Sequence, residues 1–133
     1  MSETKTAVAP TVDEPGTKDP ALDVIQIGFT IENQTSYNLT INQSRCSGVD
    51  FSAWPQSIPA GGTARFSQGG TFQVKFDAWY YVNNFPGTGA QVDFSGYWTA
   101  GWYHDSAITS DPAGVFPGSS TVPTSNSCTY ILK

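Results

Sequence analysis

Charged side chains are scarce in this chain and make up only 13% of its 133 residues. Lysine and arginine together number six, and the four that follow residue 23 are spread out singly as Arg45, Arg65, Lys75 and Lys133. Proteins that bind nucleic acids, or that dock electrostatically on anionic lipid, use clustered basic side chains. We therefore expect no nucleic-acid partner, and a peripheral membrane contact would have to use aromatic side chains or a headgroup pocket.

Long apolar segments are also missing. The sequence has no run of about 18 apolar residues, the minimum for a membrane-spanning helix. Residues 1–22 lack the apolar core of a signal peptide and are acidic and rich in threonine, proline and alanine. They predict a disordered acidic tail. The chain is expected to be soluble, either cytoplasmic as encoded or exported without a recognisable signal peptide.

Few residues are of the types that catalysis or metal binding needs. His104 is the single histidine, and the chain has neither a Gly-x-Ser-x-Gly nucleophile motif nor a second metal ligand at metal-binding spacing. We therefore expect a protein that is not an enzyme and that has no cofactor and no metal. One catalytic alternative stays open, because Asp77 and Asp93 would form the carboxylate pair of a glycosidase if they lie close together.

The two cysteines, Cys46 and Cys128, are far apart in the sequence and neither belongs to a Cys-x-x-Cys motif. Without a secretory signal, buried thiols are favoured over a disulfide. The alternative, a disulfide, would tie the middle of the chain to its C-terminal strand and stabilise the fold by roughly 2–5 kcal/mol.

What the sequence does contain is the composition of an all-β protein. Glycine and aromatic residues are abundant, and apolar and polar residues alternate over several short segments. We predict a single antiparallel β-sandwich of about seven to eight strands over residues 23–133. Residues 24–31 and 37–42 are expected to form a first hairpin, and residues 121–133 a final strand that closes a sheet. Residues 105–124 are expected to form an extended loop around Val115 and Phe116, or else to hide a short strand.

The clearest alternation spans residues 71–98 and predicts a β-hairpin closed by a loop at residues 83–89. The inward residues of its first strand are Phe72, Val74, Phe76, Ala78, Tyr80 and Val82. Residues that face each other across a hairpin interact, so the register decides which outward side chains meet. The expected outward pairs are Trp79 with Asp93, Tyr81 with Gln91, and Lys75 with Tyr97. The alternative is a register shifted by two residues, which would leave the same side chains on each face.

Aromatic residues gather in the stretch from Phe94 to Asp105, which holds two of the four tryptophans, two of the six tyrosines and the histidine. Phe94 and Trp98 fall on the inward face and are expected in the core. The other aromatic residues, together with the outward polar residues of the hairpin, predict a ligand-binding surface. Its expected members are Trp79, Tyr81, Asp77, Asp93, Gln91, Tyr97, Trp102 and Tyr103.

Such a surface is typical of sugar recognition, because flat rings cover the apolar face of a pyranose while carboxylates and amides bind its hydroxyls. It also suits a lipid headgroup, since aromatic rings attract a quaternary ammonium. We therefore predict a non-catalytic recognition module for glycans or lipid headgroups at a membrane or cell surface. The alternative is a structural or assembly subunit that uses the aromatic cluster as a protein–protein contact, for example in a homo-oligomer. Burial of this face under another sheet is disfavoured by its charges, which are Lys75, Asp77 and Asp93.

Part of the sequence resembles a known group of proteins. The segment from Ile27 to Ser36, followed by Leu39, Ser47-Gly48 and Ile58-Pro59-Ala60-Gly61, is similar to the opening of the actinoporin-like and aegerolysin-like β-sandwich cytolysins. The resemblance covers residues 25–70. It implies a compact sandwich that recognises membrane lipids through exposed aromatic residues, and Trp98, Trp102 and Tyr103 are similar in kind to that aromatic cluster. Residues 1–22 do not form the amphipathic helix of pore-forming members, so the resemblance implies recognition rather than a lytic toxin.

Overall fold

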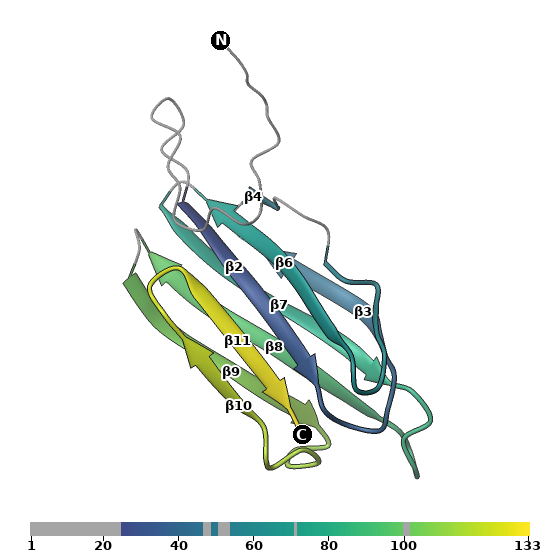
Figure 1. Ribbon diagram of the computed structural model, residues 1–133. Coiled ribbons are helices and arrows are strands. Elements are labelled where there is room, and N and C mark those ends of the chain that lie inside the picture. The colour runs from purple at the N-terminus through teal and green to yellow at the C-terminus, as the bar shows by residue number, and fades with distance from the viewer. Residues whose placement is uncertain (1–24, 47–48, 51–53, 71, 100–101) are drawn as a thin grey trace.

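The chain folds into two β-sheets that pack face to face (Figure 1). The computed structural model describes residues 25–46, 49–50, 54–70, 72–99 and 102–133, so the predicted acidic tail lies outside the described residues. The described residues form ten strands and no helix. The strands are β2 (Ile25–Asn33), β3 (Leu39–Cys46), β4 (Val49–Asp50), β5 (Ser57–Ile58), β6 (Thr63–Gly70), β7 (Gln73–Val82), β8 (Ala90–Thr99), β9 (Trp102–Asp111), β10 (Ser120–Pro123) and β11 (Ser127–Leu132).

Each sheet has five strands. One, called the β2 sheet below, has the order β10-β11-β2-β6-β4, and the other, called the β7 sheet, has the order β5-β3-β7-β8-β9. Strands β4 and β5 contain only two residues each, so eight longer strands form the body of the sandwich. The predicted fold class, an antiparallel β-sandwich, is confirmed, although one strand pair, β11 with β2, is parallel. Within the described part of the chain, no helix is long and apolar enough to cross a membrane.

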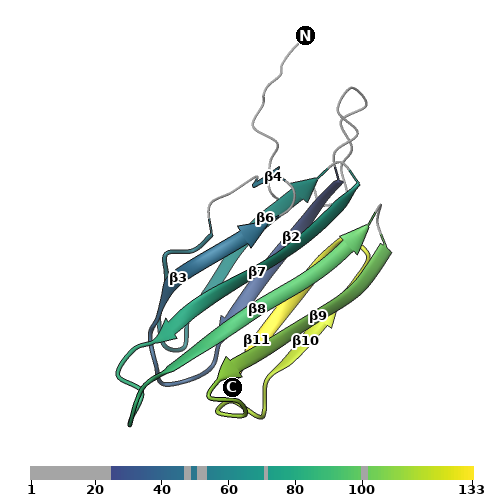
Figure 2. The same ribbon diagram turned by 180° about the vertical axis from the view of Figure 1, so that it is seen from behind.

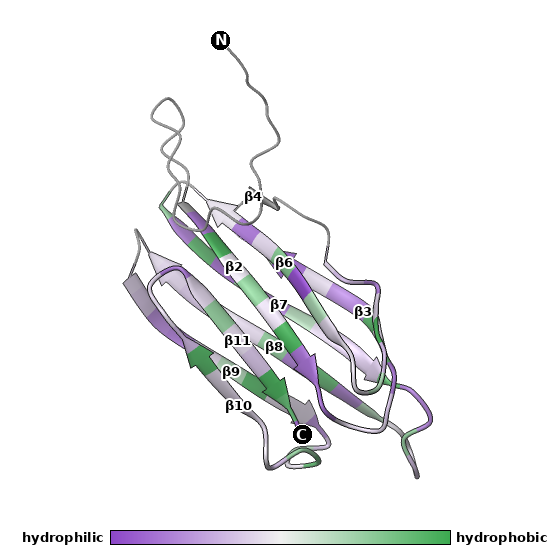
Figure 3. Cartoon of the chain, in the orientation of Figure 1, coloured by the Kyte–Doolittle hydropathy of each residue, from purple (hydrophilic) through white to green (hydrophobic). Residues whose placement is uncertain are grey.

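Aromatic rings from both sheets fill the space between them. The ring centroid of Phe29 in the β2 sheet lies 4.7 Å from that of Phe76 and 5.5 Å from that of Trp98 in the β7 sheet, and both contacts are edge to face. Tyr130 of the β2 sheet belongs to the same cluster, and its ring stacks on that of Phe29 at 6.3 Å between centroids. Apolar and polar residues alternate along the strands that meet here (Figure 3). Because successive side chains of a strand point to opposite faces, the apolar ones gather between the sheets.

The polar atoms of these large rings have partners inside the sandwich. The indole nitrogen of Trp98 donates a hydrogen bond of 2.9 Å to the carbonyl oxygen of Thr124. The hydroxyl of Tyr130 donates one of 2.7 Å to the carbonyl oxygen of Ser95. Both rings are therefore buried without an unpaired donor, which makes them acceptable in an apolar core.

The hairpin predicted from residues 71–98 is present as β7 and β8, with the predicted register. Val82 pairs with Ala90, and the three outward pairs have formed as well. They are Trp79 with Asp93, Tyr81 with Gln91, and Lys75 with Tyr97. Period-two alternation excludes a shift of one residue, which would bring the apolar set to the solvent side, but a shift of two residues would keep the same faces. The structure shows that the strands pair without such a shift.

One residue of that hairpin lies elsewhere than predicted. Phe72 is 77% exposed rather than inward. Strand pairing begins at Gln73, which is opposite Thr99, so Phe72 lies beyond the end of the sandwich, where no sheet covers it. The other predicted inward residues of β7 are buried, and so are Phe94 and Trp98 of β8.

The first predicted hairpin is wrong, because β2 and β3 belong to different sheets. Strand β2 pairs with β6 and β11, whereas β3 pairs with β5 and β7. Asn33, at the end of β2, is buried and holds the crossing in place. Its Nδ2 donates to the carbonyl oxygens of Tyr37, Ile58 and Pro59 at 2.8, 3.2 and 3.1 Å. Alternation shows that a strand has one apolar face, but it does not show which neighbour the strand pairs with.

Residues 105–124 are not one loop, since their first part belongs to strand β9, and the alternative that this stretch hides a strand is confirmed. Strand β9 is an edge strand that pairs with β8 alone, and its middle carries small and polar side chains instead of a row of large apolar ones. Alternation is weak in such a strand because few of its side chains enter the core. Val115 and Phe116 follow β9 and pack against the core as partly buried residues.

The final predicted strand is present as β11, but it does not close the edge of a sheet. It lies between β10 and β2 and runs parallel to β2. Its Cys128 is buried, while Cys46 is half-buried on β3 in the opposite sheet, and no disulfide joins the two. Burial raises the pKa of the Cys128 thiol. The favoured interpretation of the cysteines as thiols therefore agrees with the structure.

Candidate functional site

The side of the β7 sheet that faces away from the β2 sheet is called the outer face below (Figure 2). Side chains on this face alternate along β7 and β8 with the buried residues that face the core. It brings together six of the eight predicted site residues. These are Asp77, Trp79, Tyr81, Gln91, Asp93 and Tyr97.

The other two predicted residues, Trp102 and Tyr103, lie on opposite sides of β9. The register between β8 and β9 shifts next to Trp98, which pairs with Tyr103, and their rings meet edge to face at 5.3 Å. Trp102 pairs with Thr99 at the end of the outer face and is 74% exposed. Consecutive residues of a strand point to opposite sides, so Tyr103 does not belong to the predicted surface.

A row of polar side chains crosses the outer face near the loop between β7 and β8. Tyr81 on β7 pairs with Gln91 on β8, and Gln91 pairs with Asp111 on β9. Asn42 on β3 connects the first two. Its Nδ2 donates to Gln91 Oε1 at 2.8 Å, and its Oδ1 accepts from the Tyr81 hydroxyl at 3.0 Å. These two bonds orient the Tyr81 ring and the Gln91 amide on the surface.

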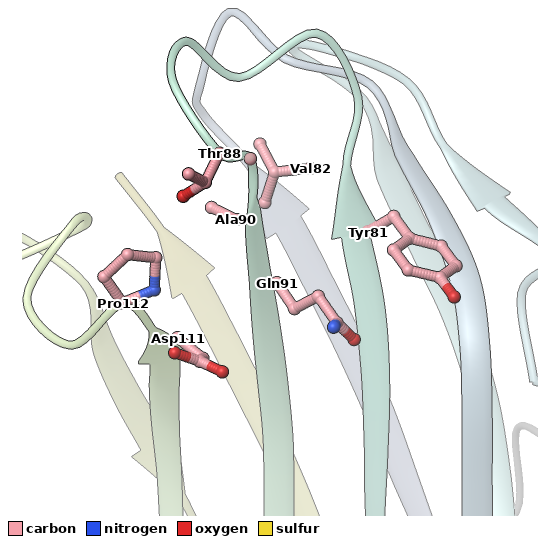
Figure 4. Close-up of a pocket in the computed structure, with 8 residues that line it drawn as sticks. Tyr81, Val82, Thr88, Ala90, Gln91, Asp111 and Pro112 are labelled. Carbon is pink, nitrogen blue, oxygen red and sulfur yellow. The ribbon is translucent and has the colours of Figure 1, made fainter.

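A pocket of about 350 Å³ opens beside this row (Figure 4). In the close-up, the Gln91 side chain lies between Tyr81 and Asp111, with Thr88 and Pro112 at one side. Tyr81 is 46% exposed, so its ring is available to a ligand. The residues that line the pocket are Tyr81, Val82, Thr88, Gly89, Ala90, Gln91, Asp111 and Pro112.

An ion pair lies farther along the outer face, where β3 meets β7. Arg45 is opposite Asp77, and its Nη2 and Nε lie 2.8 and 3.3 Å from the two carboxylate oxygens. This is the forked arrangement that guanidinium and carboxylate groups prefer. The hydrogen bond to Asp77, and then the charge of Asp77, raise the pKa of Arg45. Both side chains are therefore already engaged with each other.

Asp93 is the most buried of the predicted polar residues, with 9% of its surface exposed. It is opposite Trp79, and its Oδ1 has no hydrogen-bond partner among the described residues. Burial, followed by the charge of Asp77, raises the pKa of Asp93 to about 6, although a backbone hydrogen bond at Ala78 and the charge of Arg45 act in the opposite direction. A carboxyl group shielded in this way is poorly placed to contact a ligand directly.

The two aspartates of the glycosidase alternative lie diagonally across the hairpin, because Asp77 is opposite Ser95 and Asp93 is opposite Trp79. One carboxylate is bound by Arg45 and the other is shielded from solvent. A glycosidase needs both groups open to the scissile bond, and this arrangement does not provide that. Among the described residues, no group of three or more histidine, cysteine, aspartate or glutamate side chains could hold a metal ion.

Tyr97, near the opposite end of the outer face from the pocket, is covered by neighbouring side chains. The ring of His104 stacks on it at 4.5 Å between centroids and 25° between planes. The Nε2 atom of His104 lies 2.6 Å from Thr99 Oγ1, which holds the imidazole in this position. The Lys75 ammonium lies 5.6 Å from the centre of the Tyr97 ring. A cationic ligand would have to displace a cation that the protein itself supplies.

Sequence reasoning missed two residues of the polar row, Asn42 and Asp111. Asn42 lies on the polar side of a strand whose predicted partner is in fact in the other sheet, so nothing placed it beside Tyr81. Asp111 falls in the predicted loop at residues 105–124. Asp111 lies two residues after Thr109 and four after Ala107, which also face outward, so alternation could have placed it on the outer face. The side chains of Thr109 and Ala107 are too small to show which face of the strand is apolar and which is polar.

Comparison with known proteins does not show a family for this chain. No protein-family model matches the chain, and no curated protein matches it. The resemblance of residues 25–70 to actinoporin-like and aegerolysin-like cytolysins therefore stays a prediction. The outer face has to be interpreted from its own side chains.

Proposed function

We propose that this protein is a non-catalytic recognition module that binds a glycan at the pocket on the outer face. The observation that carries the proposal is the row formed by Tyr81, Gln91 and Asp111, in which an exposed ring lies beside an amide and a carboxylate. A ring covers the apolar face of a sugar, while the amide and carboxylate bind its hydroxyls. The pocket volume of about 350 Å³ lies in the range typical of small-ligand sites.

The same face supports a glycan better than a lipid headgroup. Recognition of a quaternary ammonium needs several free rings around the cation. Tyr97 is covered by His104 and Lys75, and Tyr103 points to the other side of β9. The rings therefore do not form a cage, whereas one exposed ring flanked by hydrogen-bonding groups fits a sugar.

Replacement of the Tyr81 ring is expected to weaken glycan binding. Tyr81→Ala loses the contact between ring and sugar, worth about 1.4 kcal/mol or roughly tenfold in affinity. Tyr81→Phe keeps the ring and loses only the bond to Asn42, so its affinity is expected to fall less. A glycan array identifies the ligand, and isothermal titration calorimetry with the strongest-binding oligosaccharide then compares the variants.

Trp102→Ala is the matched control, because Trp102 is also an exposed aromatic residue but lies at the other end of the outer face. It is expected to bind with the affinity of the wild type. A wild-type protein that binds no glycan on the array would refute the proposal, and so would equal affinities for Tyr81→Ala and the wild type.

An assembly role is favoured by a separate observation at that other end. Phe72 and Trp102 are 77% and 74% exposed. They lie at the same end of the β7 sheet, since Gln73 pairs with Thr99 and Thr99 pairs with Trp102 (Figure 2). Large apolar side chains exposed at one end of a sheet are typical of protein–protein contacts.

The assembly role predicts a defined oligomer in solution. Light scattering would then show that wild type and Tyr81→Ala share one oligomeric state, and that the double variant Phe72→Ser, Trp102→Ser dissociates into monomers. Dissociation is expected because a contact of this kind depends on burying the two rings. Circular dichroism checks that the double variant is folded. A wild-type protein that is monomeric at every concentration tested rules this role out.

A further inference from the structure

We infer that the pocket selects neutral sugars and rejects sugars that carry a carboxylate or a sulfate group. This inference rests on the proposed function and specifies the class of glycan that the same site takes. It follows from the negative charge of the pocket, because one of the eight residues that line it, Asp111, is acidic and none of the eight is basic. Asp111 is exposed and forms no ion pair with any described residue.

The described basic side chains of the outer face are engaged away from the pocket. Arg45 binds Asp77, which is four residues, or about 13 Å, from Tyr81 along β7. Lys75 lies over Tyr97 and is six residues, or about 20 Å, from Tyr81. Exposed charges are screened over about 8 Å at physiological salt. Neither cation therefore offsets the carboxylate of Asp111 at the pocket.

The Asp111 carboxylate, which forms no ion pair with a described residue, acts differently on the two classes of sugar. It accepts hydrogen bonds from the hydroxyls of a neutral sugar through two oxygens. A sialic acid, uronic acid or sulfated sugar brings a second negative charge into the same pocket, where no lining residue supplies a cation. At a separation of about 5 Å near a protein surface, this repulsion lowers affinity about fivefold or more. Rejection by an unpaired like charge is a common source of specificity.

The test compares neutral glycans with their anionic counterparts. An array carries neutral oligosaccharides, such as lactose and N-acetyllactosamine, each beside its sialylated and its sulfated form, and calorimetry then measures affinities for the best-bound set. We expect the neutral form to bind about fivefold more tightly at low salt, and the difference to narrow at high salt because exposed charges are screened. Asp111→Asn removes the charge and keeps the size of the side chain, so it should bring the affinity ratio close to one.

Asp105→Asn is the matched control. It makes the same change on the same strand, but six residues or about 20 Å from Asp111, so the affinity ratio should stay at its wild-type value. A wild-type protein that binds the neutral and anionic forms equally, or prefers the anionic form, overturns this inference and leaves the proposed function standing. A ratio that Asp111→Asn leaves unchanged overturns it as well. If no glycan of either class binds, the proposed function fails and the inference fails with it.

Discussion

Gly96→Ala is expected to lower the free energy of unfolding by about 3 kcal/mol, because the core has no room for a single added methyl group. A Cβ atom at Gly96 would lie 2.5 Å from Cζ3 of Trp98, 2.9 Å from Cε1 of Phe76 and 2.9 Å from the hydroxyl oxygen of Tyr130. All three neighbours are buried and belong to the aromatic cluster between the sheets. None of these rings can move without disturbing another, so the strain cannot be relieved locally.

Urea unfolding of the variant measures this loss, and Gly118→Ala is the matched control. The control makes the same glycine-to-alanine change, but its new Cβ would lie 3.4 Å from the Cβ of Lys133, a permissible distance at the surface. It is expected to change stability by less than about 1 kcal/mol in either direction. A Gly96→Ala protein as stable as the control would show that the sheets pack less tightly around Trp98 than the structure indicates.

The second large effect concerns Asp93, whose replacement by asparagine is expected to stabilise the protein at neutral pH. Burial raises the pKa of this carboxyl from 3.8 to about 6 in the folded protein, with the charge of Asp77 adding to the shift. The neutral acid is therefore favoured by folding. Its contribution to stability is complete below about pH 4 and is lost as the pH rises through 6, which costs the wild type about 2 kcal/mol at pH 7.5.

The measurement is the difference in unfolding free energy between Asp93→Asn and wild type as a function of pH. This difference should be small near pH 4, should grow in favour of the variant between pH 4 and 6, and should level off above pH 6. Arg45→Gln extends the test, because the charge of Arg45 lowers the pKa of Asp93. Without that charge, the pH dependence assigned to Asp93 should move to higher pH. A difference that stays constant from pH 4 to 7.5 would contradict the assignment.

The aromatic stretch from Phe94 to Asp105 shows which side-chain directions can be predicted from alternation in the sequence and which cannot. Alternation separated Phe94 and Trp98, which are in the core, from Tyr97, which is on the outer face. It did not separate Trp102 from Tyr103, because these two residues had no strand assigned to them. Once β9 is formed, neighbouring residues point to opposite sides and the predicted cluster divides.

The sequence by itself determined which residues of β7 and β8 face the core and that the two strands form a hairpin. Both results depend on neighbours in one hairpin, where the burial of Val74, Phe76 and Tyr80 excludes a shift of one residue, whereas a shift of two residues would keep the same faces. The sequence also determined the all-β class, since local composition and alternation are enough to show that strands are present.

Only the tertiary structure decided which strands share a sheet, that β11 runs parallel to β2, and that β9 extends the outer face. It thereby placed Asn42 and Asp111 on either side of Gln91 and buried Asp93. These arrangements depend on pairing between segments far apart in the chain. An apolar face can be buried against several alternative partners at similar free energy, and only the packing of the complete core selects among them.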